Sequence, residues 1–301
     1  AARQAGRDVQ VPFTPGRTDA QGWGALTAAV ITATRYHSAD LDAADPERVY
    51  EAVFDGMLTQ LDHFSRYAGR DAAREHRASR EGFGGIGVRI RLIEDGVLVL
   101  SVMEDTPALT AGLKEDDIIV AIDGESVEGL SQREVVNRLR GRVGTEVSLS
   151  IERGNAAPLT VAVKRAHILP QTVSYRREGN VAYIKLSGFN NGTTDALREK
   201  IAEAQLEIGD ALRGYILDLR GNPGGLLEQA VSVSDVFVTD GRIVSTHGRH
   251  SNSHQYFRSE RTERGDLTND APLVVLIDGD SASASEIVAA ALQDSGRAVL
   301  V

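Results

Sequence analysis

The sequence predicts an α/β protein with a small β-rich module and a helical N-terminal segment, on three observations. Over residues 170–301, apolar strand-like runs alternate with helical patterns, which is typical of layered α/β folds with a mixed, largely parallel sheet. Over residues 82–166, short alternating strands and two short helical patterns indicate a compact unit. Over residues 25–81, apolar residues recur at helical spacing.

The N-terminal part predicts a tail followed by helices. Residues 1–24 are rich in Gly, Pro, Arg and Gln and have no period, so we expect a flexible tail there. Asp45 before Pro46 predicts an N-cap followed by proline in the first turn of a helix. Residues 70–81 are charged and predict an exposed helix or linker.

The middle module begins with a hairpin signature. Apolar residues alternate over residues 88–92 and 97–99, on either side of Glu94-Asp95-Gly96. The elements expected after it are a short helix over 107–111, the strand Ile118–Ile122, a helix over 131–139, and strands over 147–151 and 159–163.

The C-terminal region alternates strand and helix. The expected order is the strand Val181–Leu186, a helix over 194–206, the strand Tyr215–Leu219, a helix from Leu226, the strand Leu273–Ile277, a helix over 285–293 and a last strand over 298–301. Residues 239–269 form a polar, hairpin-like excursion that contains histidines and arginines.

Composition excludes several classes of function. The chain has 301 residues, a net charge of −10 and a pI near 5.3, which argues against nucleic acid or anionic membrane as the main partner. Cysteine is absent, so disulfides, thiolate catalysis and cysteine-ligated zinc are excluded. No apolar run of roughly 18 residues predicts a transmembrane segment, and no signal peptide is visible.

The stretch Leu273–Leu292 predicts a buried strand, a tight turn and a helix start. Ser281, Ser283 and Ser285 lie in the turn. A hydroxyl at such a turn lies near the positive end of the helix dipole, as an acyl-transfer nucleophile requires. Ser283 and Glu286 also fit a capping box, which is the commoner role for serine at a helix start. The residues alone do not choose between these roles, nor among the three serines.

The glycine-rich segment Gly82–Gly87 matches G-x-G-x-x-G but does not predict a dinucleotide site. That motif follows a strand and opens a helix, whereas here a charged segment precedes it and an alternating strand follows. Backbone N–H groups beside a strand edge can instead hold a peptide carboxylate. The alternative is a plain glycine-rich turn.

A second strand-to-helix turn lies within Leu217–Leu226. Gly224 and Gly225 follow Pro223, which allows close approach of the backbone to a ligand and N–H donation to an oxyanion. No G-K-[ST] follows, so this is not a phosphate-binding loop. The alternative is an ordinary loop.

Histidines and lysines are the remaining candidate ligands and bases. His247, His250 and His254 lie in a polar segment that lacks the helix face and carboxylate of a typical metal site, so we expect no metal. One of them as a base for Ser283 remains an open alternative. The four lysines, including Lys185, are expected to be solvated.

The order of these motifs resembles a known family. After the G-I-G module come T-P-A-x-x-A-G-L and L-R-G-x-x-G-T, then L-D-L-R-G-N-P-G-G-L and S-A-S-A-S-E-I. Residues from about 45 to 301 resemble the carboxyl-terminal (tail-specific) processing proteases, a serine peptidase family with an inserted PDZ domain. The resemblance implies a crotonase/ClpP-like protease core, a PDZ-like domain over residues 82–166, no cofactor, and an extracytoplasmic or periplasmic location.

The resemblance also implies roles for single residues. Ser283 would be the nucleophile, and the N–H groups of Gly224, Gly225 and Ala284 would bind the oxyanion. The PDZ-like domain would hold the C-terminal tail of a protein or peptide substrate. The implied peptide-binding residues are Gly84, Gly85, Ile86, Gly87, Val88 and Arg140. Arg140 would also link this domain to the protease core.

One feature departs from the family pattern. The family's general base is a lysine in an F-G-K-G-type stretch after the nucleophile, with a glutamine shortly after it, and no lysine lies among residues 284–301. We therefore expect a core truncated at its C-terminal end and an inactive fragment of a Ser/Lys endopeptidase. The alternative is a non-catalytic, PDZ-type peptide-binding scaffold. An α/β-hydrolase is disfavoured, since the expected G-x-S-x-G motif is absent around Ser283, which is flanked by Ala282 and Ala284.

Overall fold

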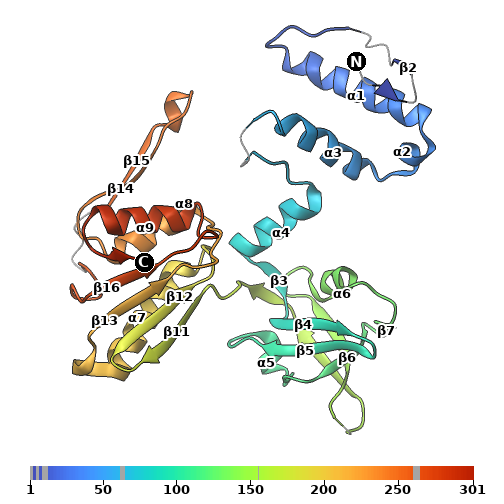
Figure 1. Cartoon of the computed structure of the whole chain (residues 1–301). Coiled ribbons are helices and arrows are strands. Elements are labelled where there is room, and N and C mark those ends of the chain that lie inside the picture. The colour runs from blue at the N-terminus through green and yellow to red at the C-terminus, as the bar shows by residue number, and fades with distance from the viewer. Residues whose placement is uncertain (1–2, 5–6, 9–12, 62–64, 155, 260–264) are drawn as a thin grey trace. The chain divides into compact units, whose positions relative to one another are not determined.

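The structure is a computed structural model (Figure 1) that describes residues 1–301 apart from 1–2, 5–6, 9–12, 62–64, 155 and 260–264. The chain divides into two compact units, residues 1–76 and 77–301. None of the helices in the described part of the chain is long and apolar enough to cross a membrane.

The first unit is mainly helical. It contains β1 (Arg3–Gln4), β2 (Arg7–Asp8), α1 (Ala20–His37), α2 (Ala39–Ala43), α3 (Pro46–Leu58) and the start of α4 (Arg70–Glu81). Asp45 caps α3 as predicted, because its carboxylate accepts from the Glu47 amide at 2.9 Å.

The predicted tail of residues 1–24 is wrong in its extent. Helix α1 begins at Ala20, where the Asp19 carboxylate accepts from the Gly22 amide at 2.8 Å. Gly22 and Gly24 in the first turns lower the helix propensity and obscured this start in the sequence.

The β-rich module contains an antiparallel sheet in the order β4-β5-β6-β8-β9, and β7 pairs with β6. Its elements are β4 (Val88–Ile93), β5 (Gly96–Val102), α5 (Pro107–Thr110), β6 (Ile118–Ile122), β7 (Glu125–Ser126), α6 (Gln132–Leu139), β8 (Glu146–Glu152) and β9 (Leu159–Lys164). Inward residues such as Val97, Ile119 and Val147 join Val135 of α6 in one core. The predicted hairpin and the strand over residues 118–122 are confirmed.

A small sheet of β3 (Phe83–Gly85) and β10 (Ala166–Ile168) closes this module. The sequence did not predict these strands, since the glycines of β3 give no alternation. The pairing extends the module to Ile168, two residues past the predicted boundary at Ala166.

The C-terminal region has a five-stranded sheet in the order β11-β12-β13-β16-β17. Its strands are β11 (Val173–Glu178), β12 (Val181–Leu186), β13 (Gly214–Asp218), β16 (Leu273–Leu276) and β17 (Val299–Leu300). All neighbours are parallel except β11 and β12, which agrees with the predicted mixed, largely parallel sheet.

Three helices pack on one face of this sheet. They are α7 (Thr193–Ile208, followed by the short helix η1, Gly209–Ala211), α8 (Leu227–Asp235) and α9 (Ala284–Asp294). Alternate strand residues, including Ile184, Leu217 and Val275, share one core with Ile201 and Val288 of these helices. The polar excursion is a hairpin of β14 (Gly241–Thr246) and β15 (Gln255–Ser259), with the turn η2 (Ser251–Ser253) at its tip.

This topology brings two loops together. Strands β13 and β16 are adjacent and parallel, so their carboxyl ends lie at the same edge of the sheet. The loop from β13 to α8 carries the glycines, and the loop from β16 to α9 carries the serines. Ligands in open α/β sheets bind at this edge.

Candidate active site and peptide groove

Direct hydrogen bonds join the loop after β13 to the loop after β16. The Gly221 amide donates to the Asp278 carboxylate at 2.9 Å. The Ala282 amide donates to the Asn222 carbonyl at 3.1 Å. The serine turn is therefore held against the glycine loop.

The structure distinguishes the three serines of this turn. Ser281 Oγ donates to the Leu219 carbonyl at 2.8 Å, and Ser285 Oγ donates to the Asn222 carbonyl at 2.9 Å. Ser285 is fully buried, whereas Ser283 is exposed. The outer serines thus tie the turn to the glycine loop, and the middle serine presents its side chain to solvent.

Ser283 has an unusual backbone for a helix cap. It is the N-cap residue of α9, and its amide donates to the Glu286 carboxylate at 2.5 Å, so the predicted pairing with Glu286 is present. However, Ser283 has φ 54° and ψ −111°, where a side chain costs about 1–3 kcal/mol. An ordinary cap adopts an extended backbone. Capping alone therefore does not account for this conformation.

Gly224 lies directly against the serine turn. It has φ 96°, and a methyl group built on it would lie 2.8 Å from both Ser283 Cβ and the Ala284 nitrogen. A side chain here would be strained and would collide with the turn. The sequence-based expectation that the serine and glycine bends meet is therefore correct for Gly224 and Ser283.

The other expected oxyanion donors differ in their surroundings. Ala284 is the first residue of α9, where amides of a helix lack intrahelical acceptors. Gly225 forms a bridge to Phe189, and a side chain on it would collide with the Phe189 carbonyl oxygen. The Gly224 amide already donates to Asn222 Oδ1 at 2.9 Å.

Sequence reasoning did not identify Asn222 as a site residue. Its side chain is fully buried and bridges two segments, because Oδ1 accepts from Gly224 while Nδ2 donates to the Leu186 carbonyl at 3.0 Å. Its backbone carbonyl accepts hydrogen bonds from the Ala282 amide and from the Ser285 hydroxyl. An asparagine before Pro-Gly is a signal for a side-chain-to-backbone turn, which would have indicated the contact with Gly224.

A charged cluster lies at the end of β13, beside this loop. The buried Asp218 carboxylate accepts from Tyr183 and, at 2.9 Å, from Arg220 Nε. Burial opposes ionisation, but the hydrogen bonds from Arg220 and Tyr183 outweigh it and hold the pKa of Asp218 well below its ordinary range. Lys185 Nζ lies 3.8 Å from Asp218, so this half-exposed lysine is ion-paired rather than merely solvated.

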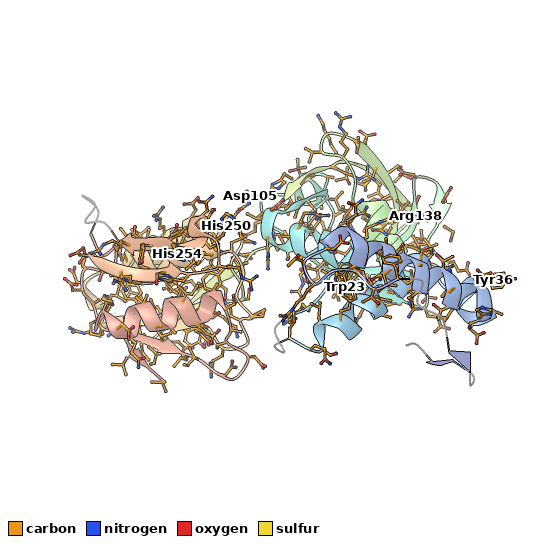
Figure 2. The ribbon with its side chains drawn as sticks, turned by 90° about the horizontal axis from the view of Figure 1, so that it is seen from above. Trp23, Tyr36, Asp105, Arg138, His250 and His254 are labelled. Carbon is orange, nitrogen blue, oxygen red and sulfur yellow. The ribbon has the colours of Figure 1, made fainter. Side chains whose placement is uncertain are left out.

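The histidines lie in and beside the tip of the β14–β15 hairpin, where His250 and His254 are labelled in Figure 2. The rings of His247 and His254 are 5.0 Å apart, and His254 Nε2 lies 2.9 Å from the Gly248 carbonyl. Among the described residues, no group of three or more His, Asp or Glu side chains is arranged to hold a metal ion. The alternative of a histidine base stays a prediction.

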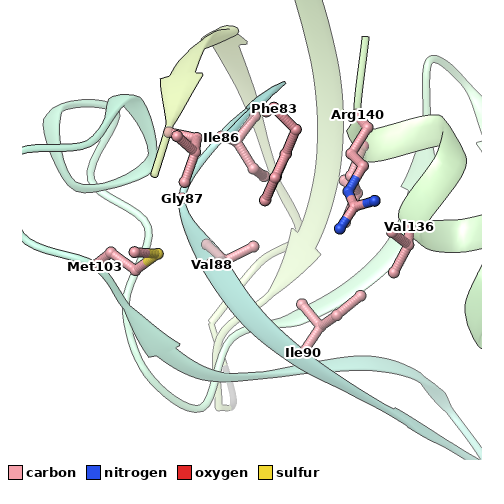
Figure 3. A pocket seen from close by; sticks show the side chains of 11 residues that line it. Phe83, Ile86, Gly87, Val88, Ile90, Met103, Val136 and Arg140 are labelled. Atoms are coloured by element: carbon pink, nitrogen blue, oxygen red, sulfur yellow. The ribbon is translucent and has the colours of Figure 1, made fainter. Parts of the chain in front are cut away.

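A groove of about 110 Å³ lies between β4 and α6. Figure 3 shows Val88 and Ile90 from β4 facing Val136 and Arg140 on the α6 side. The Arg140 guanidinium lies 4.1 Å from the centre of the Phe83 ring. Apart from Arg140, the lining side chains are apolar: Phe83, Ile86, Val88, Ile90, Met103, Val136, Leu139 and Ile168.

The structure places most of the predicted peptide-binding residues in this groove. Gly85, Ile86, Gly87, Val88 and Arg140 line it. Gly84 is not among the lining residues; it lies in β3, opposite His167 of β10, and its carbonyl accepts from the Gly141 amide at 3.0 Å.

Comparison with known proteins gives two family matches. Residues 180–301 match the model of peptidase family S41, and residues 84–164 match that of the PDZ domain. A carboxy-terminal-processing protease of Bartonella bacilliformis is 43% identical over 260 residues, which cover 85% of this chain and 59% of that protein. The carboxy-terminal processing protease CtpA of Bacillus subtilis is 32% identical over 260 residues, which cover 85% of this chain and 54% of that protein. The chain thus spans somewhat over half of the length of these relatives.

Solved structures include similar chains. The photosystem II D1 C-terminal processing protease is 27% identical, with a TM-score of 0.38. The match covers 76% of this chain and 62% of that chain.

Proposed function

We propose a function on the basis that the chain belongs to the carboxy-terminal processing proteases of peptidase family S41 and contains a PDZ domain. The proposed function is that of a serine endopeptidase that acts on protein tails. The observation that carries the proposal is Ser283, an exposed serine on a strained backbone that lies against Gly224. The PDZ groove would bind the C-terminal tail of a substrate, and the core would cleave upstream of it.

In the proposed reaction, Ser283 Oγ attacks the scissile carbonyl carbon and transfers its proton to a base. The carbonyl oxygen becomes an oxyanion beside the start of α9, where the Ala284 amide and the helix dipole stabilise negative charge. Gly225 is proposed as a second donor. Gly224 can donate only if its amide leaves Asn222 Oδ1.

The base is the part of the proposal that rests on family resemblance alone. A lysine is expected in this role, and none follows Ser283 within the 301 residues. We therefore propose that the 301-residue polypeptide alone is inactive. Loss of a base removes several orders of magnitude of rate. An extracytoplasmic or periplasmic location is proposed on the same family resemblance.

One observation favours a second candidate function. The groove between β4 and α6 is formed by residues of this chain and is lined almost entirely by apolar side chains. A non-catalytic scaffold that binds peptide tails would need this groove and no catalytic base. A lysine after residue 301 in the encoding gene, in an F-G-K-G-like context, would favour the protease.

The test is labelling by a serine-directed fluorophosphonate probe, together with cleavage of an unstructured tail, in the protein as encoded by its complete gene. Ser283→Ala is expected to abolish both. Ser281→Ala and Ser285→Ala are matched controls from the same turn, and they are expected to retain labelling at reduced rates, since their hydroxyls bond carbonyl groups. Labelling that persists in Ser283→Ala would exclude Ser283 as the nucleophile. Cleavage by the 301-residue polypeptide that Ser283→Ala removes would contradict the lysine assignment and favour a histidine base.

A further inference from the structure

The edge of the PDZ sheet carries two exposed arginines. Strand β4 lies at the end of the sheet order, so one of its edges has no strand partner in the sheet. Val88 and Ile90 line the groove, whereas Arg89 and Arg91 alternate with them and are exposed. Successive side chains of a strand point to opposite faces, so both arginines project away from the groove.

We propose that this edge selects substrate tails by charge as well as by apolar contacts. The preferred tail has apolar residues at its last and third-last positions, and Asp or Glu at its second-last and fourth-last positions. The inference rests on the proposed recognition of tails by this PDZ domain and names the tail chemistry that it prefers.

Strand addition explains why position in the tail matters. A peptide that binds a PDZ domain adds to the sheet edge as a further strand, and pockets accept alternate side chains. Side chains that point into the groove meet Val88, Ile90 and Val136, which are apolar. The side chains between them lie on the opposite face, beside Arg89 and Arg91. Directly opposed residues of paired strands have Cβ atoms about 4.5–5.5 Å apart, which is within reach of an ion pair.

The surroundings leave these two charges available to a ligand. Within the described residues, no ion pair is recorded for Arg89 or Arg91, whereas Arg138 pairs with Glu125 and Arg153 pairs with Asp117. The cross-strand neighbours of Arg89 and Arg91 on β5 are Ser101 and Leu98, which carry no charge. The groove lining contains no carboxylate.

The expected effect is moderate because the arginines are exposed. Exposed ion pairs typically change binding by about 1.5- to 5-fold each. Because solvent screens such pairs, the preference should weaken as the salt concentration rises. Main-chain pairing and the apolar pocket would supply most of the affinity.

The test uses the 301-residue protein and fluorescein-labelled peptides that share valine at the last and third-last positions. Three peptides carry Glu, Gln or Lys at the second-last and fourth-last positions, and fluorescence anisotropy gives each Kd at low and high salt. We expect the tightest binding for Glu and the weakest for Lys. The double variant R89Q/R91Q should remove this order. Lys164→Gln, on the opposite edge strand β9, is the matched control and should retain it.

The outcomes separate the two proposals. Equal binding of all three peptides, or the same order in R89Q/R91Q as in the unaltered protein, overturns the charge selection and leaves tail recognition intact. If none of the three peptides binds, tail recognition itself is overturned, and the charge selection with it. Three peptides tested on the unaltered protein keep the result decisive even if the double variant does not fold.

Discussion

Two helices of this chain begin with the same pattern, Ser-x-x-Glu, and their serines have different backbones. Ser131 caps α6 with an extended backbone, at φ −71° and ψ 155°, and forms a closed capping box with Glu134. Ser283 precedes α9 at φ 54° and ψ −111°. The pattern therefore predicts a helix start in both places, but it does not predict which serine is held in a strained conformation.

The difference comes from the neighbouring chain segments. The box of Ser131 is local, since its hydrogen bonds join residues three apart. The turn around Ser283 is instead tied to the loop after β13 through Ser281, Ser285 and Asn222. A strained backbone persists only where the surroundings determine it. These long-range bonds support the proposed role of Ser283 more directly than its own motif does.

Gly224→Ala should break the arrangement around Ser283 most strongly. The variant places a methyl group 2.8 Å from Ser283 Cβ at a positive φ, so we expect a destabilisation of about 2–4 kcal/mol. In the protein encoded by the complete gene, we expect a loss of at least about 100-fold in kcat, because the proposed oxyanion donors would be displaced. Denaturant unfolding and cleavage kinetics measure the two effects.

Gly221→Ala is the control for the same loop. Gly221 also has a positive φ, of 70°, but a methyl group built on it meets nothing within 4 Å. We expect a conformational cost of about 1 kcal/mol and little change in kcat. Equal kinetic effects of the two variants would show that contact with Ser283 is not what matters at Gly224.

Asn222→Ala tests whether the loop after β13 holds the serine turn in place. The variant leaves the Gly224 amide and the Leu186 carbonyl without their buried partners, so we expect about 2–3 kcal/mol of destabilisation. Protection of the α9 amides against hydrogen exchange should fall, while that of α6 should not. Asn180→Ala, at an exposed turn, is the control and should change stability by at most about 0.5 kcal/mol. Unchanged protection of α9 would contradict the positioning role.

Much of the fold was predictable because its elements carry strong local signals. The strands over residues 118–122 and 181–186 begin and end as predicted, and residues 70–81, predicted as an exposed helix or linker, form a helix. Strand β11 was missed, since only Val173 of its six residues is buried and no alternation results. The start of the N-terminal helical segment was predicted at residue 25, later than the observed start of α1 at Ala20, because glycines in its first turns lower the helix propensity.

The candidate site was predictable in its parts but not in its connections. The sequence placed Ser283, Gly224 and Ala284 at two strand ends that parallel pairing brings together. It could not choose Ser283 over Ser281 and Ser285, because that choice depends on bonds to carbonyls about 60 residues away along the chain. Main-chain acceptors of this kind leave no trace in the residue types.

Replacing each of the two cap serines by glycine should change the stability of its helix in opposite directions. Ser283→Gly relieves a positive φ, so we expect stabilisation of about 1 kcal/mol, together with loss of the proposed activity. Ser131→Gly removes an ordinary cap and should destabilise α6 by a few tenths of a kcal/mol. Hydrogen exchange of α6 and α9 reports each effect at its own helix. Destabilisation of α9 by Ser283→Gly would mean that capping outweighs strain there.

The smallest expected effect is a pH dependence at α6. Hydrogen bonds from the Ser131 hydroxyl and amide lower the pKa of Glu134 below its ordinary value of 4.5. A carboxyl group with a lower pKa in the folded state stabilises that state above the unfolded pKa, and this stabilisation is lost as the pH falls through the folded value. An NMR titration of the Glu134 carboxyl carbon should therefore have its midpoint below 4.5. Ser131→Ala should return the midpoint toward 4.5, whereas Ser126→Ala, outside the box, should not move it. A midpoint that Ser131→Ala leaves unchanged would show that the local box does not hold Glu134, and would remove the contrast with the long-range bonds around Ser283.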